Sequence, residues 1–206
     1  MVLGFPPSAP GPRPGRRLWP SRILATAVAA CAFSGAAQVG HAHAGEPEPG
    51  YGLKAGYLAK FTPFIDWPDA AFEGPGSPFH LCIGGRDPFG AIIDRATNGL
   101  KVGDHPVVVV RLSPVAKEGA KSPDCHLLFL SASRQQTPQQ MLAAVAGRPV
   151  LTVADETLEA PSAMVQFVTV ESRLRFTIRA DAAQAAGLTL SSKLLALSAQ
   201  PRDGSR

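Results

Sequence analysis

The stretch FHLCIGGRDPFGAIIDRATNG, residues 79–99, places a short apolar segment before a glycine-rich turn and an expected helix. Residues 79–83 are apolar and end at Gly84-Gly85, which predicts a buried strand. Asp87-Pro88 is typical of a helix N-cap followed by proline at the first helical position, and it predicts a helix that reaches about Ala96. A strand followed directly by a helix indicates an α/β sheet.

The same alternation continues along the chain. Three more mainly apolar runs predict strands, at residues 107–112, 125–130 and 150–153, the first two of them in the interior of the sheet. Thr137-Pro138 opens a helix before the last of these strands, and Gly147 closes it. Residues 164–170 and 174–179 flank a short turn, which predicts a hairpin.

Helices are expected at both ends of this region. Apolar residues at helical spacing predict an amphipathic helix over residues 52–66, with its buried stripe at Leu53, Tyr57, Phe61, Phe64 and Ile65. Lys54 falls off that stripe, and Pro63 is expected to kink the helix. Asp181 is expected to cap a short helix that ends at Gly187. Residues 191–199 are expected to form a last helix. The sequence thus predicts an α/β fold with a layered sheet, parallel in the centre with an antiparallel edge hairpin, flanked by helices.

The first 44 residues form a separate class of sequence. They hold four arginines and no acidic residue, then an uncharged stretch over 23–40, and they end in Ala42-His43-Ala44. This pattern predicts a signal peptide cut after Ala44, hence a periplasmic protein. Two weaker alternatives are a lipidated Cys31 and a twin-arginine signal at Arg16-Arg17.

Composition limits the remaining classes. The chain has 206 residues, 45% of them hydrophobic, which is enough for one core, and we expect one domain over 51–199 between disordered tails at 45–50 and 200–206. The chain holds 20 basic and 16 acidic residues, and loss of the four leader arginines leaves 16 of each. A formally neutral product without a basic run is not expected to bind nucleic acid.

Cys82 and Cys125 are the two cysteines that remain after cleavage. In an oxidising compartment the simplest arrangement is one intramolecular bridge. Two separate buried thiols are the other interpretation, because cysteine is commonly buried without bonding.

Chemistry-bearing residues are few. Gly84, Gly85, Arg86 and Asp87 follow a strand and open a helix, so their amides could hold an anion or a nucleotide-like ligand; a tight turn that only needs glycine is the plainer interpretation. The histidines at 80, 105 and 126 lack metal-ligand spacing, and adjacent Cys125 and His126 would point to opposite faces of a strand. We therefore expect no catalytic site, no metal and no cofactor.

Several carboxylates fall between the expected strands and helices. They are Asp66, Asp69, Asp155, Glu156 and Glu159, and they are expected to be solvated surface charges.

The motifs taken together resemble the YfiR family. They are LKAGYLAKFTPFIDWP at 53–68, DPFG at 87–90, CHLLFL at 125–130, RPVLTV at 148–153, RFTI at 175–178 and GLTLSSKLL at 187–195. The resemblance implies a periplasmic, non-enzymatic α/β protein that represses a membrane-bound diguanylate cyclase through its periplasmic domain, which lowers cyclic di-GMP and biofilm formation. It also implies release by an outer-membrane lipoprotein or a redox change, a homodimer, and a bridge between Cys82 and Cys125.

For such a regulator we expect the partner surface near the end of the first helix and in the loop at 156–163. The candidate residues are Phe64, Trp67, Glu156, Leu158 and Glu159. Core packing is the other interpretation for Trp67 and for Phe72, because large aromatic residues are often buried. The alternative function is a periplasmic sensor or binding module for a small anionic or nucleotide-like ligand, which would use residues 84–87.

Overall fold

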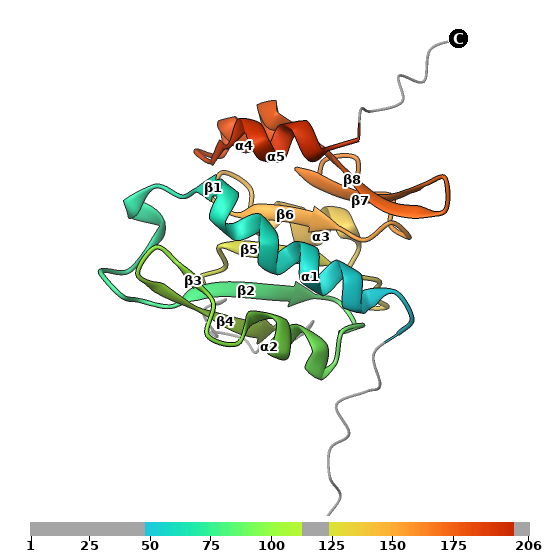
Figure 1. The fold of residues 1–206 in the computed structure, drawn as a ribbon, viewed down its shortest axis with the longest axis horizontal. Helices are drawn as coiled ribbons and strands as arrows, with labels where there is room; N and C mark the ends of the chain where they lie inside the picture. The colour runs from blue at the N-terminus through green and yellow to red at the C-terminus, as the bar shows by residue number, and fades with distance from the viewer. Residues whose placement is uncertain (1–47, 113–123, 200–206) are drawn as a thin grey trace, which may run out of the picture. The chain divides into compact units, whose positions relative to one another are not determined.

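The structure is a computed structural model that describes residues 48–112 and 124–199 (Figure 1). The helices are α1 (Tyr51–Phe61), η1 (Thr62–Phe64), η2 (Asp69–Ala71), α2 (Ala91–Thr97), α3 (Pro138–Ala143), α4 (Ala180–Ala185) and α5 (Ser192–Leu197). The strands are β1 (Ile65–Asp66), β2 (Phe79–Gly84), β3 (Lys101–Val102), β4 (His105–Arg111), β5 (Leu127–Leu130), β6 (Leu151–Ala154), β7 (Val165–Val170), β8 (Arg173–Ile178) and β9 (Thr189–Leu190).

Within the described residues, seven strands form one sheet in the order β3-β4-β2-β5-β6-β7-β8. The strands from β4 to β7 are parallel, and β8 pairs antiparallel with β7 through the two-residue turn Glu171-Ser172. Both turn residues have positive φ, as tight hairpin turns require. The predicted α/β fold with a parallel centre and an antiparallel edge hairpin is confirmed.

The opposite edge of the sheet departs from the prediction. β4 was expected in the interior, but β3 pairs antiparallel with it only at His105 and Pro106. Exposure therefore alternates along β4, and Val108 is 44% exposed. The short β1-β9 pair was not predicted either, because a two-residue strand shows no alternation in the sequence.

The two faces of the sheet hold separate cores. Leu81, Leu127 and Phe129 pack with α1 in the larger cluster, whereas Cys82 and Leu128 face a smaller cluster beneath α3. In Figure 1, α1 crosses one face of the sheet and α3 lies behind it. This division follows from the period of two in a strand, which sends neighbouring side chains to opposite faces.

The first helix differs from the predicted one in its extent and in its buried face. α1 ends at Phe61, and a 3-10 turn that contains Pro63 follows, because proline cannot donate an amide to the preceding turn. Its buried face includes Lys54, Ala55 and Leu58, while Leu53, expected inside, is 57% exposed. At the start of the helix, the buried face is therefore shifted by about one residue from the predicted one, from Leu53 to Lys54.

Two predicted helix caps are also corrected. α2 begins at Ala91, since the Asp87 carboxylate accepts from the amides of Phe89 and Gly90 at 2.7 and 3.3 Å and closes a turn before the helix. Arg179 precedes α4, so Asp181 lies in its first turn and does not cap it. Ser191 does cap α5: its hydroxyl accepts from the amide of Leu194 at 3.2 Å.

The terminal predictions fall largely outside the described residues. The expected signal peptide 1–44 with its Cys31 alternative, residues 45–47 and the tail 200–206 all lie there. Glu48, expected in a disordered tail, instead donates its amide to the carbonyl of Pro88 at 3.2 Å. In the described part of the chain, no helix combines the length and hydropathy needed to cross a membrane.

Cys82 and Cys125 form a disulfide on the smaller-core side of the sheet, with their Cα atoms 5.8 Å apart. The predicted bridge is confirmed, and the alternative of two separate thiols is wrong. The side chain of His126 stacks on Phe79 of the larger core, on the opposite face from Cys125, because the chain bends at His126 before β5.

The disulfide generates the first prediction. Replacing both Cys82 and Cys125 with serine should lower the free energy of unfolding by about 2–4 kcal/mol, because the bridge closes a long loop in the unfolded chain. The measurement is urea unfolding with and without dithiothreitol. The wild type should lose its advantage in reductant while the double variant does not respond; equal midpoints in the absence of reductant would contradict the prediction.

Candidate functional site

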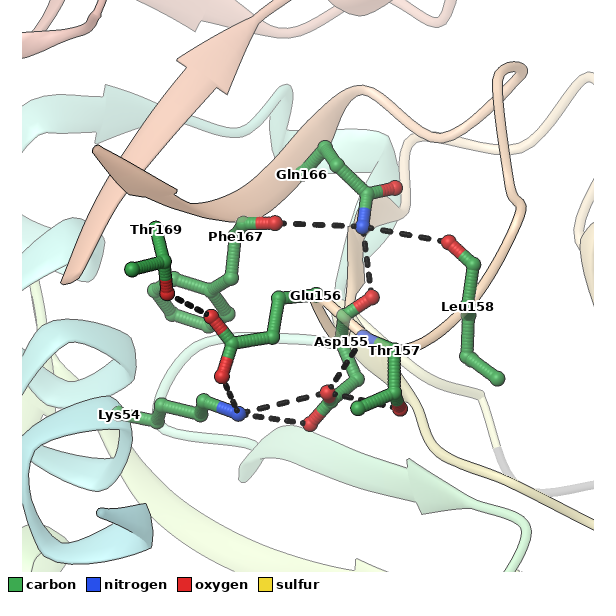
Figure 2. A network of polar contacts seen from close by, with 8 residues as sticks. All are labelled: Lys54, Asp155, Glu156, Thr157, Leu158, Gln166, Phe167 and Thr169. Atoms are coloured by element: carbon green, nitrogen blue, oxygen red, sulfur yellow. Dashed lines mark hydrogen bonds and ion pairs between the residues drawn. The ribbon is translucent and has the colours of Figure 1, made fainter. Parts of the chain in front are cut away.

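A buried ion cluster joins α1 to the end of β6 (Figure 2). The ammonium nitrogen of Lys54 lies 3.1 Å from the nearer Asp155 oxygen and 3.2 Å from Glu156 Oε1. The side chains of Lys54 and Asp155 are only 4% and 1% exposed, whereas that of Glu156 is 31% exposed. Asp155 was predicted to be a solvated surface charge, and the structure corrects that prediction.

The cluster is tolerated because nearly every polar atom in it has a partner. Asp155 Oδ1 accepts from the amide and the hydroxyl of Thr157 at 3.0 and 3.1 Å. The hydroxyl of Thr169 donates to Glu156 Oε2 at 2.6 Å, and the ring of Tyr51 lies 4.1 Å from the Lys54 nitrogen. A cation over an aromatic face is stabilised electrostatically. The Lys54 ammonium is therefore held by the Tyr51 ring as well as by the carboxylates of Asp155 and Glu156.

The electrostatics of Asp155 follow from these contacts. Burial works to raise the pKa of Asp155, but hydrogen bonds from Tyr51, Thr157 and Lys54 outweigh it, so its pKa lies below the ordinary value. Burial is also the main reason that the pKa of Tyr51 is raised, with Asp155 adding to it. A carboxyl whose pKa is lowered by folding stabilises the folded state. This stabilisation is fully present above the pKa of the unfolded state, and it is lost as pH falls through the pKa of the folded state.

The turn at 84–87 is constrained by packing. A Cβ on Gly84 would meet Met141 Sδ at 2.9 Å, and one on Gly85, whose φ is +88°, would meet the Ser131 carbonyl oxygen at 2.4 Å. Glycine is required at position 85, because its φ is positive and the chain passes close to the backbone that follows β5.

Three amides around this turn, those of Arg86, Phe89 and Gly90, have acceptors within the chain. The Arg86 amide donates to the carbonyl of Ala132 at 2.9 Å, and Asp87 accepts from the next two free amides. The side chain of Arg86 pairs with Glu48, and Asp87 Oδ2 lies 2.6 Å from Arg111 Nε. The geometry therefore favours the plainer interpretation of residues 84–87 as a structural turn, and ligand binding there stays a prediction.

The predicted partner residues fall into two groups at opposite ends of the sheet. Phe64 and Trp67 follow α1 and lie where the parallel strands begin, with Trp67 Nε1 donating to the His126 carbonyl at 3.1 Å. Trp67 is 9% exposed, so it belongs mainly to the core. The structure thus does not bring these two residues together with the loop at 156–163.

The second group lies where β6 ends. Glu156 and Leu158 line a shallow hollow of about 460 Å³ beside β7, and Glu159 is exposed nearby. Because Glu156 also contacts Lys54, this hollow adjoins the buried ion cluster.

The three described histidines gather at the beginning of the strands. His126 is 3% exposed; its Nδ1 accepts from the His80 amide at 3.0 Å, which places its proton on Nε2, 3.1 Å from the Ala71 carbonyl oxygen. The ring of Phe72 stacks between His105 and His126. Burial lowers the pKa of His126 to about 4. Among the described residues, no three His, Cys, Asp or Glu side chains are grouped to hold a metal ion.

The sequence did not reveal the ion pair between Lys54 and Asp155, because its two members come from distant parts of the chain. Lys54 and Asp155 are 101 positions apart, so no local motif joins them. One signal was present: Lys54 lies three residues after Tyr51 and four before Leu58, which is helical spacing along one face.

These features define a class of protein: an α/β domain with one internal disulfide, in which the polar side chains described above connect helices and strands of the same domain. The sequence model of the YfiR/HmsC-like family matches residues 51–199, the whole span from α1 through α5. The chain therefore belongs to the YfiR/HmsC-like family, a regulatory and non-catalytic one, and the predicted family is confirmed. No curated protein matches the chain significantly.

The ion cluster generates the second prediction. Lys54→Ala should lower the free energy of unfolding by about 3–5 kcal/mol, because it leaves a carboxylate buried without its cation. The control Lys60→Ala removes an exposed lysine from the same helix and should change it by less than about 0.5 kcal/mol. Urea unfolding at neutral pH measures both. Equal effects of the two substitutions would show that the cluster does not stabilise the fold.

His126 generates the third prediction. Its folded-state pKa of about 4 lies below its unfolded value of 6.5, so the stability it contributes is full above pH 6.5 and is lost as pH falls toward 4. Across this window we expect a loss on the order of 3 kcal/mol in the wild type.

His126→Gln keeps a donor for the Ala71 carbonyl but cannot titrate. Unfolding midpoints measured from pH 8 to 4 should therefore fall less steeply for this variant than for the wild type. Parallel curves would contradict a buried, neutral His126.

Proposed function

We propose that this protein is a periplasmic, non-enzymatic regulator that binds the periplasmic domain of an inner-membrane diguanylate cyclase and represses it. The observation that carries the proposal is membership in the YfiR/HmsC-like family across the entire described domain. Lower cyclic di-GMP, and with it less biofilm, is the proposed output. An outer-membrane lipoprotein is the proposed antagonist, and a homodimer the proposed assembly.

The disulfide supports the proposed compartment. A bridge between Cys82 and Cys125 persists in the periplasm, whereas cytosolic reductants keep most thiols reduced. A cleavable leader over residues 1–44 would deliver the chain there.

The hollow beside β7 is the proposed contact surface at the end of β6. Glu156 and Leu158 offer a charge and an apolar side chain next to each other there. Because Glu156 also contacts buried Lys54, a partner that drew its carboxylate outward would act on the cluster that fastens α1. Binding at this surface would therefore affect the contacts that hold α1 on the sheet.

The fourth prediction tests repression in cells. Deletion of the gene should raise cyclic di-GMP, and wild-type complementation should restore it. A complement with Glu156→Gln should repress less well than one with Glu171→Gln, a matched change in the exposed β7-β8 turn. Cyclic di-GMP is measured by mass spectrometry of cell extracts.

Copurification with an inner-membrane cyclase should accompany the effect. An unchanged cyclic di-GMP level on deletion, together with no such partner, would reject the proposed function and favour the small-ligand alternative. A thermal-shift screen with nucleotides, phosphate and amino acids then tests that alternative, since a bound ligand raises the unfolding temperature.

A further inference from the structure

A groove of about 830 Å³ lies at the end of the sheet where the parallel strands begin. One wall is formed by residues 62–76, which follow α1, and the other by residues 101–105, the hairpin of β3 and β4. Figure 1 shows both segments at the same side of the domain. The volume falls in the range of sites that bind ligands or peptide segments.

The inner part of the groove is a fixed aromatic surface. The Phe72 ring stacks on His105 with centroids 3.6 Å apart and planes 6° from parallel. Trp67 lies beside it, held by its hydrogen bond to the His126 carbonyl and by edge contact with Phe79. Since these rings are held by packing and hydrogen bonds, little conformational freedom is lost when a ligand contacts them.

The rim of the groove carries an excess of negative charge. Asp66 and Asp69 stand on one wall and Asp104 on the other, all exposed, whereas Lys101 is the one Lys or Arg among the lining residues. Within residues 48–112 and 124–199, none of the three carboxylates forms a salt bridge, in contrast to Asp87, Asp94 and Asp155. The rim charges are therefore available to a ligand.

We propose that this groove binds a basic, extended polypeptide segment of a partner protein. The aromatic floor suits the apolar stems of lysine and arginine, and the carboxylates on both walls suit several positive charges spaced along a chain. Exposed Pro63 and Pro75 add apolar surface at the rim without amide donors. The inference concerns the chemistry of the groove and does not require the partner to be a cyclase.

The fifth prediction uses the purified full chain and a fluorescein-labelled (Lys-Pro)5 peptide, with binding measured by fluorescence anisotropy. We expect saturable binding that weakens at high salt, and none with (Glu-Pro)5. Asp66→Asn with Asp104→Asn, one change per wall, should weaken binding about tenfold, because it removes two ion pairs. The matched control is Glu171→Gln with Asp181→Asn, which removes two exposed charges elsewhere and should leave affinity unchanged.

Three results would overturn the proposal. They are the absence of saturable binding, an equal loss of affinity in the two double variants, and competition by spermine at the same concentration as unlabelled (Lys-Pro)5. The second would indicate attraction by overall charge, and the third a site for small amines. Because the assay contains no cyclase, its failure leaves the cyclic di-GMP test intact, and the reverse also holds.

Discussion

The ammonium group of Lys54 is buried at the point where α1 crosses the end of β6, and its surroundings decide where that helix can lie. Apolar packing of Ala55 and Leu58 on the sheet has no direction and tolerates sliding. A buried ion does not tolerate it, because separation of Lys54 from Asp155 would break the buried ion pair at a cost of several kcal/mol. The ion cluster therefore sets the register of α1, and the chain that leaves the helix can reach the opposite end of the strands to form a wall of the groove.

The disulfide fastens the other face of the sheet. β2 and β5 are already neighbours, so the bridge adds no new strand pairing. Its contribution is to attach the bend at His126, which comes just before β5, to β2 through Cys125 and Cys82. Arg148, 2.6 Å from Asp124, fixes the same bend from the side of β6. The two fasteners thus act at different ends of the sheet and on different faces.

The fold was predictable from the sequence because its signals are local. An apolar run that ends in Gly84-Gly85 marks a strand, and a short turn between two β-rich segments marks a hairpin. The buried state of Lys54 and Asp155 was not predictable in this way, since residue type assigned both to solvent and their partners are remote in sequence. The groove was missed for the same reason: Asp66 and Asp104 are unremarkable in their own segments, and only the packing of those segments places them on facing walls.

One segment connects the disulfide with the groove. Cys125 bonds to β2 on one face, while the next residue, His126, sends its ring to the other face, where it stacks with Phe72 of the groove. The His126 ring is held on that face by its bonds to the His80 amide and the Ala71 carbonyl. Since Phe72 stacks on His105 as well, the residue that follows the disulfide cysteine takes part in the packing that forms the aromatic floor of the groove.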